Sequence, residues 1–225
     1  MPQPPARSLL AGAVLAMAAA ACAHPTMDET LEDNLPPERP NEMQPRAKPP
    51  VPKRNPRAQP VEIRLRIENA PGPFGVVSAG MSYDVDDERC LPRRDRLTGI
   101  RVQARHSIPI PVERTGPSSY KLVAYDNLYL PEDHYGLGVC RWKLQGVGFG
   151  LRATGAPGET RFGEFLFATE LKEAQPIRAY FLSSDYPRVS MADYPAASER
   201  DPSKFRPEVR SRLFVLEFTA RRADD

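Results

Sequence analysis

The sequence predicts an all-β protein: an antiparallel β-sandwich, immunoglobulin-like or transthyretin-like in outline, preceded by a disordered proline-rich tether. Three observations support this class. Apolar and polar residues alternate in several segments after residue 60, turn residues bound each segment, and no long stretch has the spacing of an amphipathic helix. We therefore expect a lipoprotein signal peptide over residues 1–21, a tether over 22–60 and one β-sandwich domain over 61–225.

The first 21 residues have the composition of an export signal. One cation, Arg7, precedes an apolar run from Leu9 to Ala21, which is shorter than the roughly 20 residues that span a bilayer. Three alanines before Cys22 are typical of a bacterial lipobox, in which the cysteine thiol receives a diacylglycerol and becomes the mature N-terminus. The alternative is ordinary cleavage at the small residues around Cys22, which releases a soluble secreted protein.

The residues after Cys22 indicate where the chain goes and how it is held. Ala23 and His24 lack the aspartate that is usually read as inner-membrane retention, so we expect a periplasmic protein anchored to the outer membrane, with the inner membrane as the alternative. Residues 22–60 are rich in proline and charged side chains and predict a partly polyproline-II tether. The basic stretch 46–57 is either a solvated linker or a weak contact for anionic headgroups or peptidoglycan.

Two cysteines are left for the domain, Cys90 and Cys140. An exported domain with two cysteines most simply pairs them, so we expect a disulfide, with two buried free thiols as the alternative. In the chain-entropy model, closing a loop of about 50 residues stabilises the fold by on the order of 3 to 4 kcal/mol.

The expected strands follow one another along the domain. Residues 61–69, "VEIRLRIEN", predict a strand with one buried face, because four apolar residues alternate with charged ones. Further strands are expected within residues 75–85, 107–114, 119–130, 161–170, 176–182 and 212–221. Prolines in 107–114 predict an edge strand or an extended loop there, since proline cannot donate to a strand ladder.

The stretch 138–155, "GVCRWKLQGVGFGLRATG", changes parity at Gln145–Gly146. Three core candidates before this point share one face, and three after it have the opposite parity. One residue inserted there as a β-bulge brings all six to one core, and glycine tolerates the backbone that a bulge requires. The six residues are Cys140, Trp142, Leu144, Val147, Phe149 and Leu151. We expect Trp142 to be structural and to pack beside the disulfide.

Side chains that support catalysis are few. The chain has three histidines and no G-x-S-x-G elbow, H-E-x-x-H motif, paired C-x-x-C or phosphate-binding glycine loop, so we expect no enzyme, no metal site and no cofactor. The acidic run at 84–88 lacks the central glycine and distal glutamate of an EF-hand, and we interpret it as a turn, with a calcium loop as the alternative. Scattered arginines without interleaved aromatics argue against nucleic acid as a partner.

Two polar segments carry the side chains expected at a protein interface. In "LYLPEDHYGLG", residues 128–138, aromatic side chains either anchor a partner or pack on the fold. The long stretch 183–208 repeats Asp-Tyr-Pro, and we expect a partner-binding loop whose removal leaves the thermal transition nearly unchanged. The candidate partner-binding residues are Tyr129, His134, Tyr135, Tyr186, Arg188, Tyr194 and Arg206.

The stretch "YGLGVCRWKL", with "AYDNLYLPEDH" before it, resembles a pattern in proteobacterial envelope lipoproteins. Some of these are similar to immunity proteins, which protect the producing cell from secreted antibacterial effectors. The resemblance covers about 35 residues, Tyr120 to Ala153, and its motif, Gly-x-Cys-x-Trp, is structural. It implies a lipid-anchored periplasmic protein that binds and occludes an effector. A structural or assembly lipoprotein of an envelope or secretion complex is the alternative, and a small-ligand or enzymatic lipoprotein is the third reading.

Overall fold

The computed structural model describes residues 51–93, 99–101, 103–173 and 175–222. These residues belong to one compact unit. The expected signal peptide, Cys22 and the tether up to residue 50 lie outside the described residues. Within the described part of the chain, no helix is long and apolar enough to cross a membrane.

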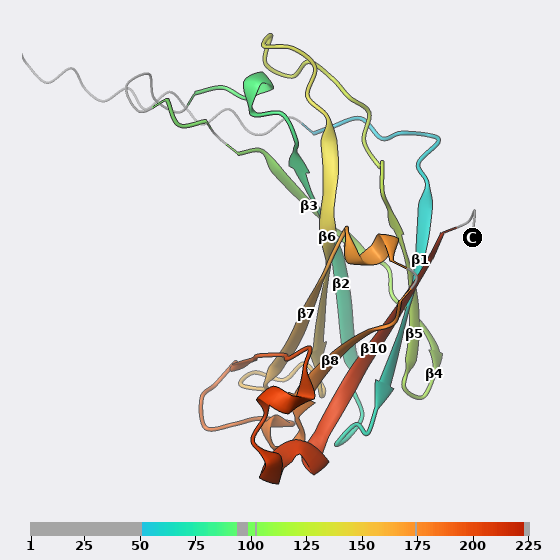
Figure 1. Cartoon of the computed structure of the whole chain (residues 1–225), viewed down its shortest axis with the longest axis vertical. Coiled ribbons are helices and arrows are strands. Elements are labelled where there is room, and N and C mark those ends of the chain that lie inside the picture. The colour runs from blue at the N-terminus through green and yellow to red at the C-terminus, as the bar shows by residue number, and fades with distance from the viewer. Residues whose placement is uncertain (1–50, 94–98, 102, 174, 223–225) are drawn as a thin grey trace, which may run out of the picture. The chain divides into compact units, whose positions relative to one another are not determined.

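Ten strands form a β-sandwich of two five-stranded sheets, as predicted (Figure 1). The first sheet has the strand order β4-β5-β1-β10-β8 and the second has the order β3-β2-β6-β7-β9. All neighbouring strands are antiparallel except β7 and β9. The strands are β1 Pro60–Glu68, β2 Val76–Val85, β3 Arg105–Ile110, β4 Glu113–Gly116, β5 Ser119–Tyr125, β6 Trp142–Arg152, β7 Arg161–Phe167, β8 Ile177–Leu182, β9 Pro195–Ala196 and β10 Leu213–Arg222.

The helices among the described residues are short 3-10 turns. They are η2 Glu88–Cys90, η3 Glu170–Lys172, η4 Ser183–Asp185, η5 Pro202–Lys204 and η6 Pro207–Arg212. The β-rich composition follows from the alternation in the sequence, which leaves each strand one face to bury.

Strand β1 lies in the middle of the first sheet, between β5 and β10. Its four alternating apolar residues, from Val61 to Ile67, are at most 6% exposed, so the predicted buried face is confirmed. Opposite them, the inner face of the second sheet contributes side chains such as Phe149, whose ring centroid lies 4.7 Å from that of Phe218 on β10. One continuous apolar core therefore joins the two sheets.

The β-bulge predicted in β6 is present. Ser82 on β2 pairs with Gly146, and the next residue, Tyr83, pairs with Leu144, which leaves Gln145 as the inserted residue. All six predicted core residues of this stretch are buried. Glycine is required at the bulge, because a Cβ at Gly146 would collide with the Leu166 carbonyl oxygen and the Phe165 ring on β7.

Cys90 and Cys140 form the expected disulfide, with their Cα atoms 5.5 Å apart. Trp142 is 6% exposed and belongs to the same core cluster as both cysteines. The indole Nε1–H donates a hydrogen bond to His134 Nε2 at 3.3 Å. Trp142 is thus a packing residue whose polar atom is satisfied by a neighbouring loop.

The predicted edge strand at 107–114 divides between two sheet edges. β3, with Pro109, lies at the edge of the second sheet, and β4 lies at the edge of the first, with Pro111 between them. At a sheet edge, a proline whose nitrogen points away from the neighbouring strand removes no hydrogen bond from the ladder. This is why the prolines predicted an edge position.

The expected tether boundary at residue 60 is wrong. Pro52 is buried, the Asn55 amide donates to the Leu128 carbonyl oxygen at 2.7 Å, and Lys53 Nζ lies 2.7 Å from Glu132 Oε1. Residues 51–59 therefore belong to the folded domain. The prolines of this segment are compatible with the fold because the segment runs as an extended chain along residues 128–132. In that arrangement few of the segment's backbone amides need a hydrogen-bond acceptor.

The stretch 183–208 is also more ordered than a free loop. It contains η4, β9, η5 and the start of η6, and Ala196 is buried. The Arg161 amide donates to the Tyr194 carbonyl oxygen at 2.8 Å, and Tyr180 and Glu199 exchange two backbone hydrogen bonds. These contacts with β7 and β8 overturn the expectation that the stretch contributes little to stability.

Candidate functional site

The outer faces of the two sheets differ in chemistry. On the first sheet, the outward side chains of neighbouring strands are charged and paired: Glu62 with Arg64 at 2.8 Å and with Lys121 at 3.5 Å, and Arg178 with Glu217 and, at 3.8 Å, with Glu68. Long charged side chains of both signs keep such a face hydrated. This pattern is typical of a sheet surface that faces solvent.

The outer face of the second sheet has small residues in its centre. Strand register places outward residues in rows across β3, β2, β6 and β7. The rows are Ser107–Ser82–Gly146–Phe167, Pro109–Gly80–Gly148–Phe165 and Ser78–Gly150–Gly163. We call this set of residues the glycine-serine face. The backbone at Gly80, Gly148 and Gly150 is partly exposed, whereas Gly146 is buried and the Phe165 ring lies beside it.

The interior of the fold does not explain every glycine on this face. A Cβ at Gly148 would lie 3.6 Å from the Phe165 ring, and one at Gly163 would lie 3.5 Å from the Phe149 carbonyl oxygen. Both are ordinary contacts, so alanine fits at either position, in contrast to Gly146. Glycine inside a strand weakens it and often marks a place where another chain or a ligand comes close.

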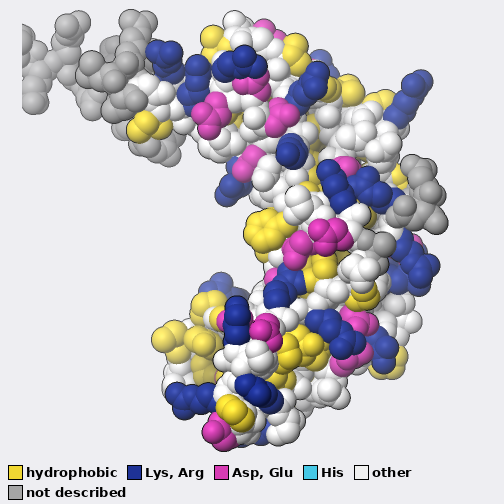
Figure 2. Space-filling model, viewed as in Figure 1, with side chains coloured by type: hydrophobic (Ala, Val, Ile, Leu, Met, Phe, Trp, Pro, Cys, Tyr) yellow, Lys and Arg dark blue, Asp and Glu magenta, His cyan; other side chains and the backbone are white. Residues whose placement is uncertain are grey.

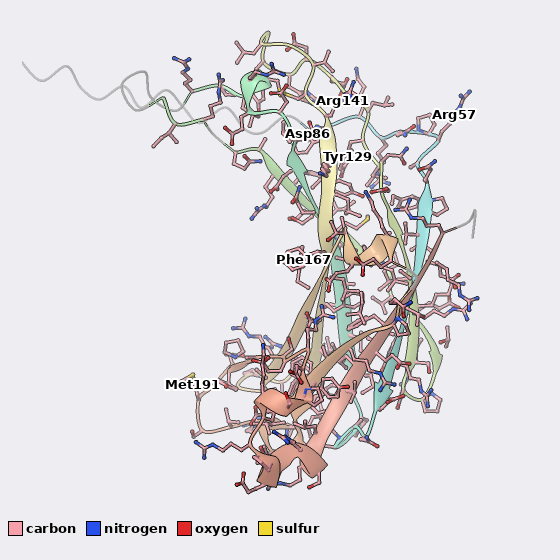
Figure 3. The ribbon with its side chains drawn as sticks, viewed as in Figure 1. Arg57, Asp86, Tyr129, Arg141, Phe167 and Met191 are labelled. Carbon is pink, nitrogen blue, oxygen red and sulfur yellow. A yellow bond between two sulfur atoms is a disulfide. The ribbon has the colours of Figure 1, made fainter. Side chains whose placement is uncertain are left out.

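Two phenylalanines on β7 border the glycine-serine face. The ring centroids of Phe165 and Phe167 lie 5.1 Å apart in an edge-to-face arrangement, and Phe167 is 58% exposed. Figure 3 shows Phe167 pointing away from the sheets, toward the side where Figure 2 shows the surface hollowed. An open depression on this face is lined by residues that include Gly80, Ser107 and Phe165. An exposed aromatic side chain beside small residues is typical of a binding surface, and here Phe167 is exposed while Phe165 is half-buried.

The predicted interface residues of the 128–138 loop take different positions. Tyr129 is 6% exposed, and its ring packs 5.0 Å from Tyr83 and 6.1 Å from Trp142, so the prediction that it contacts a partner is wrong. Its ring lies in the core against Tyr83, His106 and Trp142, and its backbone pairs with Arg54. His134 and Tyr135 are half-buried, and burial raises the pKa of the Tyr135 phenol.

The candidates in 183–208 are divided in the same way. Tyr186 packs against Phe74 with 5.3 Å between ring centroids, and Tyr194 is half-buried against the core, so both tyrosines hold the segment in place. Arg188 and Arg206 are exposed. The arginines stay available to a partner, whereas the tyrosines have a structural use that the sequence pattern did not distinguish.

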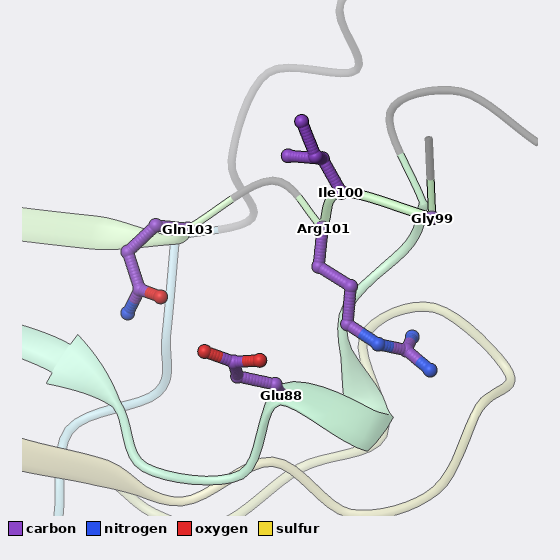
Figure 4. A pocket seen from close by; sticks show the side chains of 5 residues that line it. All are labelled: Glu88, Gly99, Ile100, Arg101 and Gln103. Carbon is purple, nitrogen blue, oxygen red and sulfur yellow. The ribbon is translucent and has the colours of Figure 1, made fainter. Parts of the chain in front are cut away.

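A second depression lies beside the disulfide end and is lined by Glu88, Gly99, Ile100, Arg101 and Gln103 (Figure 4). Of the acidic run next to it, Asp84 lies on β2, and the turn expected there begins after Val85. Asp87 caps η2 through the Arg89 amide, and the Arg89 side chain lowers the pKa of that carboxyl to about 2. Asp84 pairs with Arg105 at 2.8 Å. Among the described residues, no group of three or more His, Cys, Asp or Glu side chains is arranged to hold a metal ion.

No protein-family model, curated protein or solved structure matches this chain. Only the geometry of the glycine-serine face therefore indicates that it is a binding surface. Sequence reasoning missed this face, although a signal was present: glycine occupies every second position at 146, 148 and 150. In a strand, that spacing leaves a whole side without side chains.

Proposed function

We propose that this chain is a protein-binding module that is exported and lipid-anchored, and that its binding surface is the glycine-serine face with Phe165 and Phe167. One observation carries the proposal: the first sheet covers its outer face with paired charges, whereas the second sheet has mostly small residues in the centre of its outer face, beside two aromatic rings. Bare strands allow a partner's surface to come close over a large area, which favours shape complementarity.

The most specific form of the proposal is an immunity protein or inhibitor that occludes a secreted antibacterial effector in the periplasm. It is supported by the resemblance of residues 120–153 to envelope lipoproteins and by the lipobox pattern at Cys22. An anchor keeps such an inhibitor in the compartment where the effector arrives. Occlusion needs a complementary surface and slow dissociation rather than reacting groups.

The test compares two exposed apolar side chains on different surfaces of the full-length chain. Phe167→Ser alters the proposed face, and Leu137→Ser, 49% exposed on the 133–139 loop, is the matched control. Each tagged variant is used to capture partners from the source cell, and captured proteins are identified and assayed for hydrolytic activity. We expect one exported hydrolase, inhibited in the complex, to be lost with Phe167→Ser and kept with Leu137→Ser.

Three other results would count against this proposal in different ways. Loss of the partner only with Leu137→Ser would place the binding surface on the 133–139 loop. A constitutive envelope protein bound through Phe167 would support the assembly role in place of the immunity role. A partner bound equally by both variants would reject the proposed face.

A further inference from the structure

We infer that the partner of the glycine-serine face is an acidic protein surface, with apolar side chains between two groups of carboxylates. This inference rests on the proposed function and concerns the chemistry of the partner. It comes from the charges that border the face, which are arranged differently from those of the first sheet.

The charged residues with outward positions on β2, β3, β6 and β7 are mostly cations. They are Asp84, Arg105, Lys143, Arg152 and Arg161. The single acid, Asp84, is already bound by Arg105 in a two-point ion pair, with nitrogen–oxygen distances of 2.8 and 2.9 Å. Three cations are therefore left for this face, whereas the cations of the first sheet's outer face alternate with acids.

These cations lie at the two ends of the face. Lys143 is at the start of β6 and Arg152 is at its end, nine residues on, which corresponds to roughly 30 Å. Arg161 begins β7, and Phe165 and Phe167 follow on the same side of that strand. Along the strand direction, the face therefore has cations at both ends and small residues with aromatic rings between them.

The stretch 183–208 supplies some anionic compensation at one end. Arg152 lies 3.8 Å from the Asp193 carboxylate, and Arg161 Nε donates to the Asp193 backbone oxygen at 3.1 Å. One carboxylate against two guanidinium groups leaves an excess of positive charge, and exposed Arg188 is on the same stretch. Lys143 is exposed at the other end. Carboxylates are the partner groups that such a distribution attracts, and arginine binds them with directional hydrogen bonds.

A library of displayed random peptides, long enough to span the face, tests the inference on the full-length chain. We expect the enriched peptides to combine apolar residues with flanking Asp or Glu. Their affinity should fall by about tenfold when salt is raised from low ionic strength to about 0.5 M, because screening weakens exposed charge contacts. Lys143→Glu and Arg161→Glu should each reduce binding, and Arg221→Glu, an exposed residue of the first sheet, should not.

The outcomes separate the two proposals. Peptides that depend on Phe167 but carry no acidic residues and bind independently of salt would overturn the acidic partner and leave the binding face intact. If no peptide binds the wild-type chain better than the Phe167→Ser variant, the binding face itself is wrong. Thermal transitions of the charge variants, measured beside that of the wild type, show whether a loss of binding comes from unfolding. If Arg161→Glu unfolds the chain, Lys143→Glu tests the acidic partner alone, because the Lys143 side chain is exposed.

Discussion

The ring of Tyr186 occupies the space that a side chain at Gly72 would need: an added Cβ at Gly72 would lie 2.6 Å from Tyr186 Cε1. The Tyr186 hydroxyl also donates to the Pro73 carbonyl oxygen at 2.6 Å. These contacts join the stretch 183–208 to the turn between β1 and β2, 113 residues earlier. The segment that the sequence marked as a loop is therefore held to the sandwich by a tyrosine that fits against a glycine.

A double-mutant cycle tests this fit. Gly72→Ala in the wild-type chain should lower the free energy of unfolding by about 1 to 3 kcal/mol, because the methyl group collides with a packed ring. In a Tyr186→Ala background the same methyl group has room, so its cost should almost vanish. Denaturant unfolding of the four chains measures the coupling, and purely additive effects would contradict the contact.

Gly146 and Gly163 should respond to alanine in opposite directions. Gly146→Ala forces a methyl group into the Leu166 carbonyl and should destabilise the fold by about 1 to 3 kcal/mol. Gly163→Ala meets only an ordinary contact with Phe149 and should stabilise by roughly 0.5 to 1 kcal/mol, because alanine has less freedom to lose on folding. Thermal unfolding compares them, and equal losses would show that the second sheet tolerates no Cβ at either position.

Glu159 should make stability depend on pH. The residue is 4% exposed, and its carboxylate accepts hydrogen bonds from the Thr154 hydroxyl and amide and from the Gly155 amide, at 2.6 to 3.1 Å. The Thr154 hydroxyl, together with these amides, lowers the pKa of this carboxyl in the folded state.

The sign of the pH effect follows from the lowered pKa. The folded chain favours the ionised form of Glu159. The stability that this gives the fold is therefore complete at pH values above the pKa of Glu159 in the unfolded chain, and it is lost as the pH falls through the lower pKa of the folded chain. Glu159→Gln should therefore lower the melting temperature at neutral pH, and the difference from wild type should shrink in acid. Glu113→Gln, on the edge strand β4, is the exposed control. A difference that stays constant with pH would contradict the role of the charge.

Arg200 neutralises a buried acid on β7. Its Nη2 lies 3.0 Å from Glu164 Oε1, the Glu164 side chain is 7% exposed, and Glu164 Oε2 has no hydrogen-bond partner among the described residues. Arg200→Ala should destabilise the chain by about 2 kcal/mol, since it leaves a buried carboxylate unpaired. Adding Glu164→Gln should recover part of the loss, and a double variant that is less stable than Arg200→Ala would contradict this account.

Lipidation at Cys22 is open to a direct test. Cys22→Ala should move the protein from the membrane fraction to the soluble periplasmic fraction without changing its thermal transition, because the described fold begins at residue 51. Ser8→Ala, before the apolar run, is a control that keeps the lipobox. A Cys22→Ala chain that still fractionates with membranes would show that another feature holds it there.

Several structural features of this protein can be predicted from short stretches of its sequence. The buried face of β1, the bulge at Gln145 and the edge position of Pro109 follow from the alternation of side chains and from what proline cannot donate, which are local properties. The disulfide followed from counting cysteines in a chain that its sequence predicts to be exported.

Other features were decided only by contacts between distant segments. Tyr129 and Tyr186 look alike in the sequence, as tyrosines in polar loops. In the fold, Tyr129 packs against other aromatic rings of the core, and Tyr186 packs against the Gly72–Phe74 turn. The glycine-serine face exists because β3, β2, β6 and β7 align their small residues in register. Alternation determines that a strand has two faces. Which face is covered, and by what, depends on packing between residues that the chain brings together only when it folds.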